Sequence, residues 1–85
     1  MKPGEHYCYY PNGTQKWFHH GTLHRDGGPA IIWAGGIEEW YQHGLLHRTD
    51  GPAKTAPDGR KEWWLNNSEY DQLTWLLKVY ELDQE

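Results

Sequence analysis

The sequence repeats itself with a period of 23 residues, and this repetition limits the folds open to it. Trp17, Trp40 and Trp63 follow one another at that spacing. Other residues that recur with the same period are Gly13, Gly36 and Gly59, His24-Arg25 and His47-Arg48, and Gly28-Pro29-Ala30 and Gly51-Pro52-Ala53. One small folded unit, copied in tandem, therefore builds most of the chain.

Turn-forming dipeptides divide each unit into short strands. The first set of predicted reversals is Asn12-Gly13, Gly35-Gly36 and Asp58-Gly59, and these residues adopt positive φ at low cost. The second set is His20-Gly21, His43-Gly44 and Asn66-Asn67. The strands expected between them are Thr14–Phe18, Ile37–Tyr41 and Arg60–Trp64. Because parallel pairing needs long crossovers, we predict an antiparallel sheet of consecutive β-hairpins over about residues 9–67.

The residues after position 67 differ in character from the repeats. Asn67-Ser68, followed by Glu69 and Asp71, is typical of a helix start, so we predict a helix over about residues 68–83. An amphipathic stripe of this helix is formed by Tyr70, Leu73, Leu76, Leu77 and Tyr80, and it is widened by Trp75, Val79 and Leu82. We expect a single α+β domain over residues 1–85, with the helix packed on one face or end of the sheet.

Composition restricts the class of protein. With 36% hydrophobic residues and a mean hydropathy of -1.01, the chain is polar, and its six Trp and six Tyr must supply much of the core. A lone Cys8 excludes an internal disulfide and favours a reducing compartment. No run approaches the length of a membrane span, and Met1-Lys2-Pro3-Gly4 lacks a signal-peptide core. We therefore expect a cytoplasmic protein with no membrane partner.

The net charge of -4 lies entirely in the C-terminal tail. Residues 1–67 carry seven basic and seven acidic side chains, whereas residues 68–85 carry five acidic side chains and Lys78. This distribution disfavours a nucleic-acid partner, because the chain has no basic footprint. The acidic tail is either the solvated face of a capping helix or a contact for a basic groove on a partner.

The repeat resembles the MORN-repeat-variant family. The resemblance rests on Gly-x-x-x-x-Trp-aromatic-x-x-Gly followed by His-Arg-x-Asp-Gly-Pro-Ala, and it covers about residues 9–71. The first unit departs from the pattern at Asp26-Gly27, and the third has Asn67 in place of glycine and no His-Arg. The resemblance implies β-hairpin repeats that serve as interaction scaffolds in bacterial, phage and antitoxin-like proteins. It implies no catalytic residue.

Metal binding and catalysis find little support among the reactive residues. Candidate metal ligands are His6, Cys8, His19, His20, His24, His43 and His47. However, His24 and His47 recur with the repeat beside Arg25 and Arg48, which favours a structural task in the connectors. No Cys-x-x-Cys pair is present to close a zinc site, and Ser68 is the only serine. We expect no cofactor, no metal and no enzymatic activity.

Two aromatic ladders project from opposite faces of the predicted strands. The structural core is predicted at Trp17, Trp40, Trp63, His24, His47, Arg25 and Arg48. The candidate contact residues for a partner are Phe18, Tyr41, Trp64, Trp75, Glu81 and Asp83. Either both ladders pack against returning strands and the helix, or one stays partly exposed as an aromatic contact surface.

The expected function is a non-enzymatic protein–protein interaction. We expect a small phage or bacterial inhibitor or antitoxin-like protein that binds and blocks one toxin or host protein, in the host cytoplasm if phage-encoded. The alternatives are a metal- or nucleic-acid-binding module, and a structural protein that forms homo-oligomers through open sheet edges.

Overall fold

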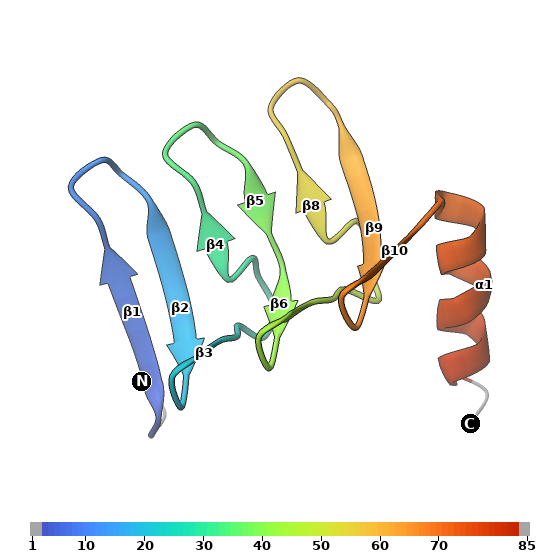
Figure 1. The fold of residues 1–85 in the computed structure, drawn as a ribbon, viewed down its shortest axis with the longest axis horizontal. Coiled ribbons are helices and arrows are strands. Elements are labelled where there is room, and N and C mark those ends of the chain that lie inside the picture. The colour runs from blue at the N-terminus through green and yellow to red at the C-terminus, as the bar shows by residue number, and fades with distance from the viewer. Residues whose placement is uncertain (1–2, 84–85) are drawn as a thin grey trace.

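The computed structural model describes residues 3–83, which form an antiparallel sheet of hairpins followed by a C-terminal helix (Figure 1). This confirms the predicted α+β class. The elements are β1 (Glu5–Tyr9), β2 (Gln15–His19), β3 (Thr22–Leu23), β4 (Ile31–Ile32), β5 (Glu38–Glu39), β6 (Tyr41–Gln42), β7 (Leu45–Leu46), β8 (Lys54–Thr55), β9 (Lys61–Leu65), β10 (Ser68–Tyr70) and α1 (Gln72–Asp83). The molecule measures 39 × 33 × 17 Å, so it is little more than one sheet thick.

The sheet follows the order of the chain. Its strands are arranged β1-β2-β4-β5-β8-β9-β10, while β3 pairs only with β2 and β6 pairs only with β7. All of these pairs are antiparallel. Figure 1 shows three hairpins side by side with their long reversals at one edge, and α1 beyond the last of them. The two ends of this row are β1 and α1.

The reversals at the long edge are three-residue loops closed by glycine. In the first, Gly13 donates its N–H to the carbonyl of Tyr10 (2.9 Å), and Tyr10 donates to Thr14 (2.8 Å). Gly13 has φ 96°, and the equivalent Gly36 and Gly59 have 95° and 94°. Only the second residue of each predicted dipeptide lies at positive φ, as expected of a type I turn with a bulge. The predicted strands begin one position later, at Gln15, Glu38 and Lys61. The predicted strand Ile37–Tyr41 is also interrupted at Trp40, so it forms β5 and the start of β6.

The reversals at the opposite edge are two-residue turns in which both residues have positive φ. His20 and Gly21 have φ 49° and 83°, and the pair at positions 43–44 is nearly identical. Asn66 and Asn67 have 48° and 69°. This conformation matches the right-handed twist of the flanking strands. The second set of predicted reversals is confirmed.

The helix begins at Gln72 and not at Ser68, which corrects the predicted boundary. Ser68–Tyr70 instead forms β10 and pairs with β9, because the turn at positions 66–67 continues the hairpin pattern of the earlier repeats. Asp71 caps the helix: the backbone N–H of Thr74 donates to its Oδ1 (2.8 Å). That hydrogen bond lowers the pKa of Asp71.

The hydrophobic core lies where α1 packs on the sheet. Leu65, Trp75 and Val79 are buried there, with Trp63 and Tyr70 packed against them. The other buried hydrophobic residues are Ala30, Ile31 and Ala53, in the interior strands. Away from the helix, strand pairing and stacking of side chains hold this thin sheet together.

Each connector folds an arginine over the tryptophan of its own repeat. The Arg25 guanidinium lies 3.9 Å from the ring centroid of Trp17 and donates to the carbonyl of Pro29 (3.2 Å). Gly28 leaves the space for it, because a Cβ there would lie 2.8 Å from Cζ of Arg25. Arg48 repeats this arrangement over Trp40 at 3.6 Å. The glycine of the Gly-Pro-Ala motif therefore leaves space for the arginine, and the proline carbonyl accepts its hydrogen bond.

Candidate functional site: the outer face of the C-terminal helix

Trp17, Trp40 and Trp63 form the first ladder, and each of these side chains is half-buried. Arginine covers the first two indoles, whereas the Trp75 ring of α1 covers Trp63 at a centroid distance of 4.6 Å. These predicted core tryptophans are only half-buried, because few side chains cover each ring in so thin a molecule. Trp17 contacts the Tyr7 ring at a centroid distance of 4.9 Å in addition to Arg25.

Trp75 was expected to contact a partner, but it is buried and only 6% exposed. Its indole Nε1–H donates to the carbonyl of Arg48 (3.0 Å). In the preceding repeat the carbonyl of Arg25 accepts from Nε2 of Gln42 (3.0 Å). The Trp75 indole thus covers a ladder tryptophan, as the connector arginine does, and donates to an arginine carbonyl, as Gln42 does. These two contacts close the end of the row of hairpins.

The second ladder forms no open aromatic surface. Phe18, Tyr41 and Trp64 are all half-buried. The Tyr41 hydroxyl donates to Glu39 (2.8 Å), and Trp64 Nε1 donates to Glu62 (3.0 Å). Burial and then the Glu39 carboxylate raise the pKa of Tyr41 above its ordinary value. Because all three are half-buried, and the polar groups of Tyr41 and Trp64 already have partners, these side chains are not the best candidates for a contact surface.

The most exposed apolar residues of α1 point away from the sheet. Leu73, Leu76, Leu77 and Tyr80 have 67%, 55%, 56% and 63% of their surface exposed. Their spacing of three and four residues places them along one side of the helix, opposite Trp75 and Val79. We call these four residues the outer stripe. The helix therefore has two apolar faces, of which the sheet covers only one.

The predicted acidic contact residues lie at the C-terminal part of the same helix. Glu81 is exposed and, with Leu82 and Lys78, borders a shallow groove of about 240 Å³ between α1 and β10. Asp83 is the last residue of α1, and its side chain lies outside the described part of the chain.

Periodicity identified the residues of the outer stripe but not its orientation. Tyr70 was assigned to the same stripe, but it lies in β10 and packs against the core. Trp75 and Val79, four residues apart, face the sheet, and the Trp75 ring packs on Trp63. The signal that could have located the inner face is the absence of a connector arginine in the third repeat.

The connector histidines, His24 and His47, form hydrogen bonds between successive repeats. Nδ1 of His24 accepts the backbone N–H of His43, and Nδ1 of His47 accepts that of Asn66, both at 3.0 Å. His24 also lies 3.3 Å from Asp26. Within residues 3–83, no three His, Cys, Asp or Glu side chains come together as metal ligands. Burial lowers the pKa of His47.

Comparison of the chain with protein-family models, curated proteins and solved structures yields no match. Within the described residues, the helix that forms is too short and too polar to span a bilayer.

Proposed function

We propose that this chain is a non-enzymatic interaction module that binds one protein target through the outer stripe of α1. The single observation that carries the proposal is the exposure of Leu73, Leu76, Leu77 and Tyr80, each more than half accessible. Monomeric proteins rarely leave a contiguous apolar face uncovered unless another molecule binds it.

The spacing of the stripe suits a groove or a second helix as the binding surface. Positions i, i+3, i+4 and i+7 of a helix are the anchors with which amphipathic helices enter apolar grooves. The inner face of α1 is already occupied, because Trp75 and Val79 are buried against the sheet. The helix is therefore held rigidly, so a target would bind a preformed surface.

Charge favours a basic target over a second copy of the chain. Residues 68–85 carry five acidic side chains and a single basic one. Asp71 at one end of the stripe and Glu81 near the other are both exposed. Two copies of the chain meeting at α1 would bring like charges together, whereas a target with lysine or arginine beside its apolar groove would be attracted. The resemblance to MORN-repeat-variant scaffolds supports the same role.

A pair of substitutions in the stripe tests this function. We expect a target captured from lysate by the wild-type chain to be lost with the Leu76→Asp/Leu77→Asp variant and kept with Tyr9→Asp, a matched change at an exposed aromatic residue of β1. Binding between purified target and chain should weaken as salt rises. Retention of the target by the stripe variant would overturn the proposal.

The oligomeric state of the chain gives a second, independent outcome. We expect light scattering of the purified protein to give the mass of a monomer across a range of concentrations. A dimer that the Leu76→Asp/Leu77→Asp variant dissociates would mean that the stripe binds a second copy, and it would replace the proposed target.

A further inference from the structure

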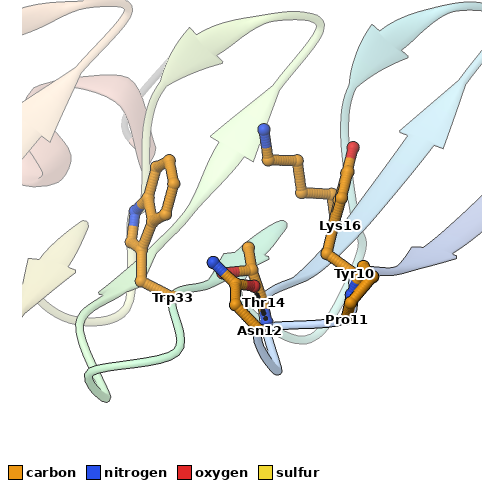
Figure 2. Close-up of a pocket in the computed structure, with 6 residues that line it drawn as sticks. All are labelled: Tyr10, Pro11, Asn12, Thr14, Lys16 and Trp33. Carbon is orange, nitrogen blue, oxygen red and sulfur yellow. Dashed lines mark hydrogen bonds between the residues drawn. The ribbon is translucent and has the colours of Figure 1, made fainter.

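A slot opens between the first two long reversals of the sheet, far along the chain from α1 (Figure 2). It encloses about 340 Å³, a volume suited to a small ligand. Its lining residues are Tyr10, Pro11, Asn12, Thr14, Lys16 and Trp33. In Figure 2 the rings of Tyr10 and Trp33 stand on either side, with Asn12 and Thr14 at the base between them.

The repeat itself places the two rings next to each other. Tyr10 and Trp33 occupy equivalent positions of successive units, so their rings project from neighbouring reversals. The third unit has Ala56 at this position. A slot with two aromatic walls can therefore form only between the first and second hairpins.

Lys16 departs from the repeat at the residue that gives the slot its charge. The equivalent residues are Glu39 and Glu62, which accept hydrogen bonds from the aromatic side chains two residues further along the chain. The Lys16 ammonium instead lies 5.2 Å from the ring centroids of both Tyr10 and Trp33. No acidic side chain lines the slot, and no ion pair of Lys16 occurs within residues 3–83. The slot is thus a positive site on an acidic protein.

The polar groups at the base of the slot have donors to spare. Oδ1 of Asn12 already accepts the backbone N–H of Thr14 (2.9 Å), and Oγ1 of Thr14 accepts that of Ala34 (3.2 Å). The hydrogens of the Asn12 amide and of the Thr14 hydroxyl remain able to donate. Donors and an ammonium group between two aromatic walls select an anion attached to a flat ring.

We infer that this slot binds a planar aromatic ring that carries one anionic group, either a carboxylate or a phosphate. The ligand ring enters between Tyr10 and Trp33 in place of the Lys16 ammonium, which moves off the two ring faces and donates hydrogen bonds to the anion. This site is separate from the outer stripe of α1, so a chain that binds a protein target at one end can bind a small molecule at the other.

Titration with defined probes tests the assignment. The probes are indole-3-acetate and adenosine monophosphate, each compared with its neutral counterpart, indole-3-acetamide or adenosine, by amide chemical shifts of the labelled protein. We expect at least one anionic probe to shift the resonances of Asn12, Thr14 and Trp33, and to bind about tenfold more tightly than its neutral counterpart. Binding of indole-3-acetate alone assigns a carboxylate ligand, and binding of the nucleotide alone assigns a phosphate.

Two substitutions test the roles of Lys16 and Trp33. Each introduces the residue that another repeat carries at the equivalent position, so the fold is expected to tolerate it. Lys16→Glu copies Glu39, and Trp33→Ala copies Ala56. We expect each to weaken binding of the anionic probe by about tenfold or more, while Leu77→Asp in α1 leaves it unchanged. Failure of both anionic probes to bind the wild-type chain, equal binding of charged and neutral probes, or unchanged binding by Lys16→Glu would overturn the inference. None of these results bears on target binding by α1.

Discussion

At the scale of single residues, each indole of the Trp17, Trp40 and Trp63 ladder packs against a side chain from a connector or from α1. Two arginines cover the first two rings, and Trp75 covers the last. Trp75 makes both the ring contact with Trp63 and the hydrogen bond to the Arg48 carbonyl. Trp75 is therefore the residue on which attachment of the helix depends most.

We predict that Trp75→Ala lowers the free energy of unfolding by about 3–5 kcal/mol, because it removes a buried aromatic ring. Trp75→Phe keeps a ring over Trp63 and loses the hydrogen bond, so it should cost less. Leu77→Ala, at an exposed position of the same helix, should change stability by less than about 0.5 kcal/mol. Urea denaturation followed by circular dichroism measures all three, and a Trp75→Ala variant as stable as Leu77→Ala would contradict the assignment.

His47 makes the stability of the fold depend on pH. Its Nδ1 accepts the N–H of Asn66 and so cannot carry a proton while that bond exists, and burial lowers the pKa of the ring. Below about pH 6.5 the unfolded chain therefore binds more protons at this residue than the folded chain, and the free energy of unfolding falls as the pH falls.

We expect the loss of stability between about pH 7.5 and pH 5.5 to be smaller in a His47→Gln variant, since glutamine can accept the same N–H without titrating. Urea denaturation at the two pH values measures the difference. The same pH dependence in both proteins would contradict the assignment of this effect to His47.

At the scale of elements, the turns were the part of the fold most accessible to prediction. Their conformations depend on adjacent residues, so Asn66-Asn67 and the dipeptides ending in glycine identified every reversal. The helix start was less accessible, because Ser68 suits a cap as well as a strand residue, and only pairing with Leu65 decides between them. The outward orientation of the stripe could not be predicted, because periodicity shows which residues share a face but not which face packs. The slot could not be predicted either, because it depends on how neighbouring reversals lie against each other.

Two glycines distinguish the effect of backbone conformation from the effect of steric space. Gly44 has φ 82°, and a Cβ added there would lie 3.8 Å from Cβ of Thr22. The φ of Gly35 is not positive, and a Cβ added there would have no atom within 4 Å. We predict that Gly44→Ala lowers the free energy of unfolding by about 1–2 kcal/mol because of backbone strain alone, and that Gly35→Ala has almost no effect. Thermal unfolding of the two variants tests this, and equal melting temperatures would contradict the turn assignment.

At the scale of the whole molecule, a fold only 17 Å thick has little interior. Three similar hairpins pair edge to edge, and the helix supplies the one cluster of buried apolar side chains at the end of the row. Because that cluster uses only the inner face of α1, two apolar residues of the same helix differ in how far they are buried. Val79 belongs to the core, and Leu77 belongs to the surface offered to a target.

The free energies of unfolding of Leu77→Asp and Val79→Asp test this distinction most directly. We predict that Leu77→Asp stays within about 0.5 kcal/mol of the wild-type chain, because its side chain already faces water, and that Val79→Asp unfolds the helix from the sheet because it buries an unpaired charge. If Leu77→Asp destabilised the protein as severely as Val79→Asp, the outer stripe would be part of the core, and it could not serve as the binding surface.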